Sequence, residues 1–392
     1  MRHFSLLFVL IALHTAVNAQ PADSSKPPVI DLSIFSDAAH HWYDINEKGA
    51  VILPLPGHPQ YKPTEITAIA DNIVLFQKDN GGWPKNYDMQ AILTADQVDS
   101  VQRSKSKTNT TFDNRTTYSH IAYLAKVYSY TKTEKYKAAA LKGLDFVIKS
   151  QYGNGGWPQY YPLEENNYSR DITYNDDAMA GVMWMLKDIV DGKPEYSFID
   201  NAYRLQLQTA FDKGLDCILK TQINDAGQPT AWCQQYDEKN MQPAWARKFE
   251  PPSICNGESP KIVLLLINIK QPSADVIYAV QSAVTWFKMS ALKGIRIETF
   301  DAPEMVTPYR ISKTDKRVVE DANAPIIWAR YYELKTHRPL FCNRDSKVVY
   351  TLAEVQRERR DGYSWYTYEP QKVLNKYPAW QKQWAPGKNV LE

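Results

Sequence analysis

The stretch QKDNGGWPKNY at 77–87 returns as QYGNGGWPQYY at 151–161, and this repeat decides the fold. A third, degraded copy runs from Gln222 to Trp232 with a longer loop. The first Gln of each copy precedes that of the next by 74 and then by 71 residues. A unit of that length accommodates a few helices and their connections. The repeat therefore predicts helical hairpins arranged around an axis, with the Gly-Gly-Trp-Pro turns at one end.

Apolar residues at helical spacing between and beyond these copies support a mainly α-helical fold. They occur, in chain order, within 66–76, 121–128, 139–148, 179–189, 205–218, 262–266 and 276–286. Short strands are expected at 294–300 and 347–352. No linker is long enough to separate two domains, so we expect a tail and lead-in at 20–62 and one large domain at 63–392.

The first residues have the features of an export signal. Arg2 and His3 precede an apolar run, and Val17-Asn18-Ala19 offers a small-x-small cleavage site. The run is too short to anchor the mature chain in a bilayer. We therefore expect a signal peptide at 1–19 and a secreted or periplasmic protein with no membrane anchor, the alternative being a buried first helix.

Composition excludes several classes of protein. The net charge of +2 gives no reason to expect a nucleic-acid partner. No C-x-x-C, H-E-x-x-H, G-x-S-x-G or phosphate-loop pattern occurs, which argues against zinc hydrolases, serine hydrolases and nucleotide enzymes. Export would permit disulfides, with three possible pairings among Cys217, Cys233, Cys255 and Cys342.

Two acidic clusters, TFDNRTT at 111–117 and TYNDDAM at 173–179, precede predicted helices. One interpretation is helix capping, because Asp and Asn satisfy the free amides of a first turn. A cap needs only one side-chain oxygen, however, and 175–177 offers more. Oxygen-rich clusters suit Ca²⁺, with further ligands supplied by distant segments or by a substrate.

Arginine and aromatic residues recur together. Trp-Ala-Arg occurs at 245–247 and again at 328–330, and Arg344 follows soon after. A single Arg is usually a surface ion pair, but Arg beside Trp in a Pro-stiffened loop suits the binding of carboxylates. With 11 Trp and 25 Tyr, the chain is also rich in side chains that cover the apolar face of a sugar. Together with the acidic clusters, these features suggest an acidic polysaccharide as ligand.

From about residue 63 to residue 366 the chain resembles the pectate lyases of polysaccharide lyase family ten. The resemblance rests on NGGWPKN at 80–86, TFDN at 111–114, NGGWPQ at 154–159, TYNDDAM at 173–179, AWCQQYD at 231–237, ARKFEPPS at 246–253, WARYYE at 328–333 and RRDGYxWY at 359–366. It implies an open (α/α) toroid that cleaves polygalacturonate by Ca²⁺-dependent β-elimination and gives 4,5-unsaturated oligogalacturonates.

The resemblance also implies roles for individual residues. Arg247 matches the base, and Asp113 and Asp176 match carboxylates that hold Ca²⁺ together with the substrate. Arg330 and Arg344 match arginines that bind substrate carboxylates. An arginine base would need positive charge nearby and an alkaline medium, because guanidinium ordinarily stays protonated.

Three further residues are expected to contact substrate: Asn114, Trp157 and Trp245. We expect the protein to act as a monomer. Two alternatives remain open at this point. Asp113 and Asp176 could be the acid and base of a glycoside hydrolase on a similar toroid, or the protein could bind glycans without cleaving them.

Overall fold

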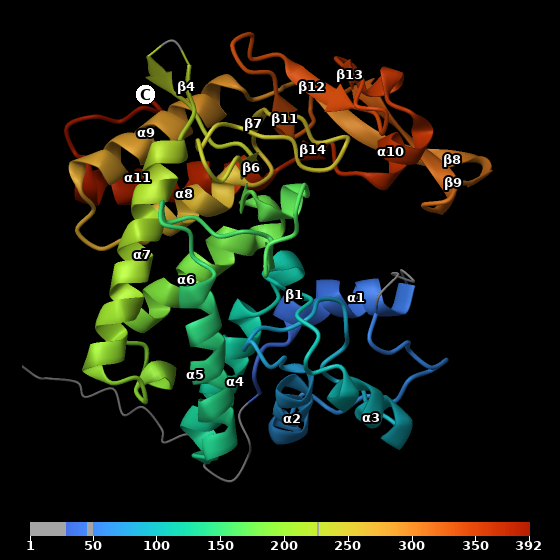
Figure 1. Cartoon of the computed structure of the whole chain (residues 1–392). Helices are drawn as coiled ribbons and strands as arrows, with labels where there is room; N and C mark the ends of the chain where they lie inside the picture. Colours follow the sequence, from blue (N-terminus) through green and yellow to red (C-terminus); the bar gives the residue numbers. More distant parts are fainter. Residues whose placement is uncertain (1–28, 45–49, 226) are drawn as a thin grey trace, which may run out of the picture.

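The computed structural model describes residues 29–44, 50–225 and 227–392 (Figure 1). The predicted signal peptide at 1–19 and the tail up to residue 28 lie outside these residues. The α-helices are α1 (Ser36–Asp44), α2 (Ile66–Phe76), α3 (Ala95–Arg103), α4 (Tyr118–Thr131), α5 (Glu134–Lys149), α6 (Ala178–Val190), α7 (Asn201–Thr221), α8 (Ser259–Ile267), α9 (Ala274–Met289), α10 (Arg357–Gly362) and α11 (Glu369–Trp384).

The strands are mostly short pairs that brace the loops at the helix ends. They are β1 (Thr110–Thr111), β2 (Tyr160–Tyr161), β3 (Ile172–Thr173), β4 (Asn224–Asp225), β5 (Gln228–Pro229), β6 (Gln235–Tyr236), β7 (Ile254–Cys255), β8 (Ile295–Val306), β9 (Ile311–Glu320), β10 (Trp328–Ala329), β11 (Tyr331–Tyr332), β12 (Pro339–Cys342), β13 (Val348–Val349) and β14 (Tyr366–Thr367). The 3-10 turns are η1 (Ser33–Phe35), η2 (Asp113–Arg115), η3 (Tyr168–Arg170), η4 (Asn175–Asp177), η5 (Pro194–Tyr196) and η6 (Leu352–Glu354).

The helices form two layers of an open toroid. An inner series α2, α4, α6 and α8 is in contact from each helix to the next, while α5, α7 and α9 pack outside as the hairpin partners of α4, α6 and α8. At one end α11 packs on α8 and α9, far from α2 at the other end (Figure 1). The predicted mainly α-helical, open (α/α) toroid is confirmed.

The repeated Gln joins one helical hairpin to the next. In each copy the side-chain amide donates to a carbonyl of its own loop and to a carbonyl of the next outer helix. The acceptors are Gly81 and Ala139 for Gln77, Gly155 and Ala210 for Gln151, and Thr230 and Ala279 for Gln222, at 2.8–3.0 Å. An amide that is buried in Gln77 and half-buried in Gln151 and Gln222 thus bridges two carbonyls and fixes the spacing between units, which explains why Gln opens each copy.

The repeated Trp anchors each turn to the helix that precedes it. Four fully buried indoles donate to a carbonyl in that helix: Trp83 to Ile73, Trp157 to Val147, Trp232 to Ile218 and Trp328 to Phe287, at 2.7–2.9 Å. The expectation that Trp157 contacts substrate is therefore wrong. Its ring is 0% exposed and its N–H is already bonded, so it is a core residue.

A smaller, strand-rich region follows α9 and has its own core around Phe341 and Trp365. Its sheet has the antiparallel order β13-β12-β11-β7, and β8 pairs with β9 in a long separate hairpin. The strand expected at 294–300 is confirmed but extends to Val306, and the one expected at 347–352 is reduced to β13. The partner strand β9 was not predicted.

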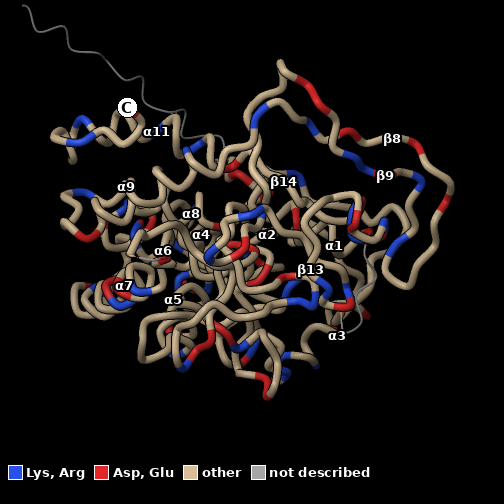
Figure 2. The backbone as a smooth tube through the Cα atoms, turned by 90° about the horizontal axis from the view of Figure 1, so that it is seen from above, with Lys and Arg blue, Asp and Glu red and all other residues tan. Residues whose placement is uncertain are grey.

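The expectations drawn from composition concern cysteines, charge and membrane spans, and the described residues bear on each of them. All four cysteines are buried free thiols. Basic and acidic residues are intermixed along the backbone, in keeping with the small net charge (Figure 2). Within the described ranges no helix combines the length and hydropathy that a membrane crossing needs.

Candidate active site

The two acidic clusters form matching loops that contact one another. The turns η2 and η4 precede the inner helices α4 and α6. In both turns the second and third residues have positive φ, 48° and 61° in η2 and 52° and 62° in η4. Such left-handed backbone is unfavourable for residues other than glycine and tends to occur at functional sites. The repeat thus places loops of the same shape at the start of two neighbouring helices.

Asp113 is a buried carboxylate with one unused oxygen. Its Oδ2 accepts a hydrogen bond from Lys85 Nζ at 3.0 Å, while Oδ1 has no hydrogen-bond partner among the described residues. Burial works to raise the pKa of Asp113, but the Lys85 ammonium outweighs it and the net pKa is lowered. Asp113 is therefore ionised at neutral pH.

Asp176 lies beside Asp113 and has an excess of negative charge around it. The closest cation in the described chain is Arg247, whose Nη2 lies 3.9 Å from Asp176 Oδ2. Burial and the Asp113 carboxylate raise the pKa of Asp176 to about 7, against the opposing effect of Arg247. No cap hydrogen bond is made by Asp177, the residue at the start of α6. Helix capping thus does not account for this cluster.

These oxygens fit a hard cation. Besides Asp113 Oδ1, the buried Oδ1 of Asn175 lacks a hydrogen-bond donor, because the Asn175 amide points its Nδ2 at Glu250 (3.4 Å). Orphaned carboxylate and amide oxygens are the ligands that Ca²⁺ takes. No group of three or more Asp, Glu, His or Cys side chains in the described residues is arranged to hold a metal. Water or substrate oxygens would have to complete the coordination.

Arg247 is held in a fixed orientation by Glu250. Its Nε and Nη2 donate to the two Glu250 oxygens at 2.8 and 2.6 Å, and Tyr363 Oη donates to the same carboxylate at 2.6 Å. Glu250 is fully buried, whereas 39% of the Arg247 side chain is exposed. Burial works to lower the pKa of Arg247, but the Glu250 carboxylate outweighs it and raises the pKa well above its ordinary value. The guanidinium is thus a protonated donor presented to the solvent side.

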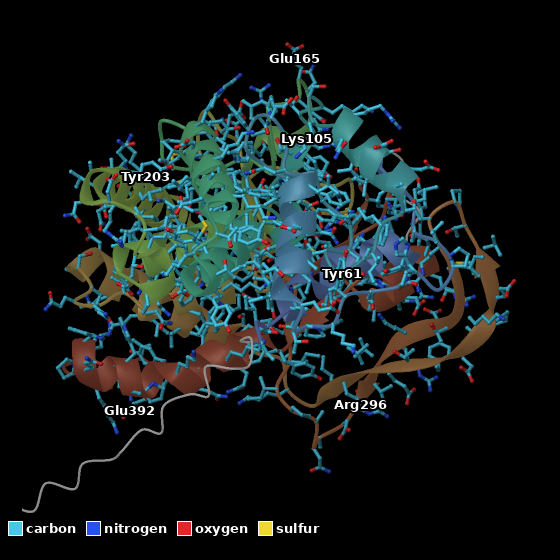
Figure 3. The ribbon with its side chains drawn as sticks, turned by 90° about the horizontal axis from the view of Figure 1, so that it is seen from below. Tyr61, Lys105, Glu165, Tyr203, Arg296 and Glu392 are labelled. Atoms are coloured by element: carbon cyan, nitrogen blue, oxygen red, sulfur yellow. The ribbon has the colours of Figure 1, made fainter. Side chains whose placement is uncertain are left out.

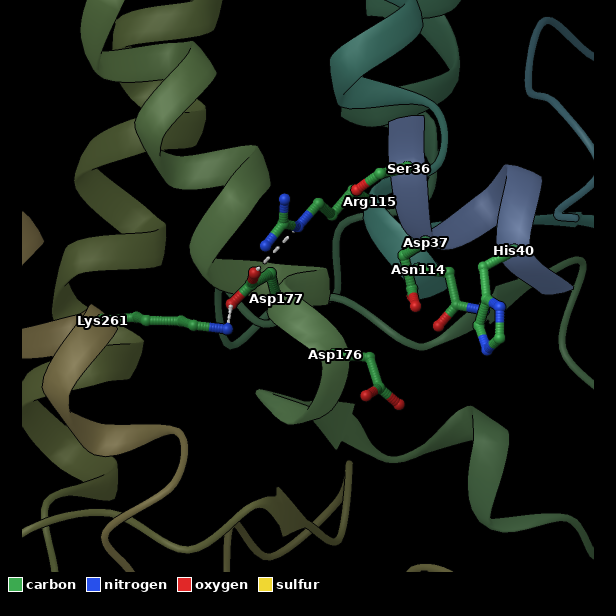
Figure 4. A pocket seen from close by; sticks show the side chains of 8 residues that line it. All are labelled: Ser36, Asp37, His40, Asn114, Arg115, Asp176, Asp177 and Lys261. Carbon is green, nitrogen blue, oxygen red and sulfur yellow. Dashed lines mark ion pairs between the residues drawn. The ribbon is translucent and has the colours of Figure 1, made fainter. Parts of the chain in front are cut away.

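A pocket of about 570 Å³ opens beside these loops (Figure 4). It is lined by Ser36, Asp37 and His40 of α1, by Asn114, Arg115, Asp176 and Asp177 of the two turns, and by Lys261 of α8. In Figure 4 Asp177 lies between Arg115 and Lys261, at 3.5 and 2.5 Å, and Asp176 lies apart from this pair. Asn114, expected to contact substrate, donates to Asn86 Oδ1 at 2.9 Å.

Arg330 is largely buried and lies, like Arg247, next to the ring of Tyr363. Its Nη2 donates to Glu258 Oε1 at 2.6 Å, and its guanidinium lies 4.9 Å from the centre of the Tyr363 ring. Because Tyr363 also donates to Glu250, this ring connects Arg330 to Arg247. Only 14% of the Arg330 side chain is exposed.

Arg344 belongs to a second group of guanidinium ions around one aromatic ring. The centre of the Phe249 ring lies 5.3 Å from the guanidinium of Arg247, 5.1 Å from that of Arg344 and 4.7 Å from that of Arg359. Arg344 and Arg359 both bind Glu358, whose pKa falls to about 2 because their hydrogen bonds and charges outweigh the effect of burial. The site therefore extends from the acidic turns past Arg247 to Arg344.

Comparisons with known proteins identify the family of this chain. Residues 77–374 match the family model described as pectic acid lyase. The chain belongs to the pectic acid lyase family. Two solved structures of a family 10 polysaccharide lyase from Cellvibrio cellulosa share its fold, each with a TM-score of 0.66. One, an aspartate-to-alanine mutant in complex with trigalacturonic acid, is 30% identical and covers 79% of this chain and 92% of its own. The other is 29% identical and covers 84% and 98%. No curated protein matched.

This member of the pectic acid lyase family is a polysaccharide lyase, which decides against the hydrolase and the non-catalytic alternatives. Of the predicted site residues, Asn114 and Asp176 line the pocket. Asp113 belongs to the turn that contacts that of Asp176, and Arg247 lies 3.9 Å from Asp176. Aromatic rings link Arg330 and Arg344 to Arg247. Trp245 is 42% exposed, so a contact with substrate stays a prediction.

Sequence reasoning missed several polar residues of this lyase's site. They are Lys85, Arg115, Asp177, Glu250, Glu258, Lys261, Glu358 and Tyr363. Lys85 follows the first Gly-Gly-Trp-Pro turn and Glu250 follows Arg247 by three residues, so both lay within quoted motifs. Glu250 could have been found from the repeat of Trp-Ala-Arg-x-x-Glu at 245–250 and 328–333, whereas the position of Lys85 is Gln159 in the second copy and gave no such signal.

Proposed function

We propose that this lyase cleaves polygalacturonate by Ca²⁺-dependent β-elimination and releases 4,5-unsaturated oligogalacturonates. The observation that carries the proposal is the Arg247 guanidinium, which Glu250 holds 3.9 Å from Asp176. The turn of Asp176 contacts the turn of Asp113, whose Oδ1 has no partner among the described residues. This arrangement offers a fixed cationic donor to an anionic ligand, and acceptor oxygens to a cation that could bridge to the same ligand. The trigalacturonic acid described with a solved relative belongs to the substrate class that we assign here.

The reaction breaks the C5–H and C4–O bonds of a galacturonate unit and forms a C4–C5 double bond; the C5 proton passes to a base, and the departing C4 oxygen takes up a proton from water to become a hydroxyl group. The C5 proton is weakly acidic because it lies α to a carboxylate, and negative charge builds up on that carboxylate as the proton leaves. Arg247 donates hydrogen bonds to this charge from a position that Glu250 fixes beforehand. Asp113 and Asp176, with Asn175, would hold Ca²⁺, which neutralises the substrate carboxylate when bound.

Arg247 is also the proton acceptor that the resemblance implies. The ion pair with Glu250 opposes deprotonation, since it raises the pKa of Arg247. A divalent cation at Asp113 and Asp176 would place positive charge next to the guanidinium and lower this pKa. The proposal therefore includes a rate that rises toward alkaline pH.

The test is an analysis of products. Protein incubated with polygalacturonate and Ca²⁺ should produce ultraviolet absorbance from a double bond conjugated with a carboxylate, in step with new reducing ends. New reducing ends without this absorbance would indicate hydrolysis and overturn the proposal.

A further inference from the structure

The β8–β9 hairpin extends from the strand-rich region as a long arm. Its strands pair from Ile295 with Glu320 to Val306 with Ile311, with one irregularity after Asp301. Figures 2 and 3 show the arm curving away from the helical body and turning back at its tip; Figure 3 labels Arg296 near its base. Around its turn the arm exposes Val306, Tyr309 and Ile311 by 64–67%.

The helix α10 fixes the orientation of this arm. On one side of α10, Arg360 binds both oxygens of Asp315 at 2.8 and 2.6 Å. Arg310 at the turn binds Asp361 at 3.1 Å, and Asp361 also accepts from Ser312 at 2.5 Å. These charged hydrogen bonds hold the distal half of the hairpin in one place.

The neighbouring residues of α10 belong to the active site. Glu358 and Arg359 form the cluster with Arg344 around Phe249. One short helix thus binds the arm through Arg360 and Asp361 and the site through Glu358 and Arg359. The position of the tip is thereby set relative to Arg344.

Tyr309 at the turn lies on Arg344. The guanidinium of Arg344 is 3.7 Å from the centre of the Tyr309 ring, and the ring itself remains 64% exposed. Arg344 uses Nε and Nη2 for Glu358, and in the described residues no acceptor meets its Nη1. The guanidinium ions of Arg344 and Arg359 share the single negative charge of Glu358, so one positive charge is left over. Arg359 is only 8% exposed, whereas 28% of the Arg344 side chain is exposed, so this charge is accessible at Arg344. An accessible cationic donor next to an exposed aromatic ring is the combination that suits a uronate.

We propose that Tyr309 is a substrate-binding residue that forms, with Arg344, an outer subsite for a uronate unit away from the cleaved bond. The carboxylate of that unit would bind the free edge of Arg344, and its apolar face would lie against the part of the Tyr309 ring that Arg344 leaves uncovered. A polysaccharide that passes Arg247 in the direction of Arg344 reaches this subsite last. The inference rests on the proposed function, because it needs a polymeric uronate in the site.

The test compares Tyr309→Ala and Tyr309→Phe with wild type on polygalacturonate and on oligogalacturonates of decreasing length. Tyr309→Ala should raise KM for polygalacturonate about fivefold to tenfold, with kcat nearly unchanged because Tyr309 touches no reacting atom. The effect should disappear with oligomers too short to reach from Arg247 to the tip. Tyr309→Phe keeps the ring and should behave like wild type.

Ile311→Ala is the matched control, since Ile311 is equally exposed near the same turn. It should leave KM unchanged. An unchanged KM in Tyr309→Ala at every length, or an equal rise in Ile311→Ala or with the shortest oligomers, would overturn the inference. Failure of the wild type to cleave polygalacturonate would instead contradict the proposed function.

Discussion

Arg247→Lys tests whether the fixed fork of Arg247, rather than its charge, supports the reaction. Lysine keeps the positive charge but cannot donate to both Glu250 oxygens in the geometry that Arg247 uses, at 2.8 and 2.6 Å. A hydrogen bond to a charged group contributes about 1.5–3 kcal/mol. Lysine can retain one of the two hydrogen bonds to Glu250. Because 39% of the Arg247 side chain is exposed, solvent also weakens the ion pair. We therefore expect a stability loss of about 1–2 kcal/mol, near the lower end for one such bond.

The effect on turnover should be much larger than the effect on stability. Removal of one fixed donor to a developing oxyanion typically lowers kcat by a factor of about 10²–10³. The assay is the initial rate of ultraviolet absorbance increase with saturating polygalacturonate and Ca²⁺, at a temperature where thermal unfolding shows both proteins fully folded.

Arg296→Lys is the matched control for this substitution. Its side chain is 41% exposed and pairs with Glu298 at 3.1 Å, far along the chain from the site. It should leave kcat unchanged. A kcat for Arg247→Lys close to that of wild type would refute the role of the guanidinium fork and indicate that another residue of the site reacts.

Three other predictions address charge and the repeat. Burial and Asp113 raise the pKa of Asp176 from 3.8 to about 7, so the stability tied to its protonation is complete below pH about 4 and is lost as pH rises through 7. Without divalent cations, the melting temperature of Asp176→Asn should therefore be higher than that of wild type at pH about 8, and the two melting temperatures should become equal toward pH about 4. A difference in melting temperature that does not change with pH would contradict the raised pKa of Asp176. Gln151→Ala, which removes two hydrogen bonds to backbone carbonyls, should cost about 1–3 kcal/mol in denaturant unfolding, whereas exposed Gln206→Ala in α7 should cost little. Trp157→Phe should lower the melting temperature without raising KM, and a raised KM with normal stability would restore Trp157 as a substrate contact.

The helical framework was predictable because its signals are local. Apolar spacing indicated α2 and α4 to α9, and the repeat of Gln and Trp indicated successive units. The function of the repeated Trp was not predictable, because an indole suits both a sugar platform and a buried anchor. Only packing shows that Trp157 is fully buried.

Site residues that lie in recognisable sequence motifs were predictable, whereas those that join the site only through side-chain contacts were not. Asp113, Asp176 and Arg247 lay in motifs, and the chain brings them together. The bidentate partner Glu250 and its effect on the pKa of Arg247 depend on side-chain geometry. The Tyr309 contact depends on an arm whose second strand gave no recognised signal, so nothing in the sequence connected residue 309 with Arg344.

A calcium titration of activity tests the central claim most directly. Wild-type protein freed of metal with EDTA is mixed with polygalacturonate, and ultraviolet absorbance is followed as Ca²⁺ is added, alongside Asp113→Ala. We expect no absorbance increase in EDTA, full recovery in wild type with Ca²⁺, and little recovery in Asp113→Ala. Undiminished formation of unsaturated product by the wild type in excess EDTA would contradict the central claim.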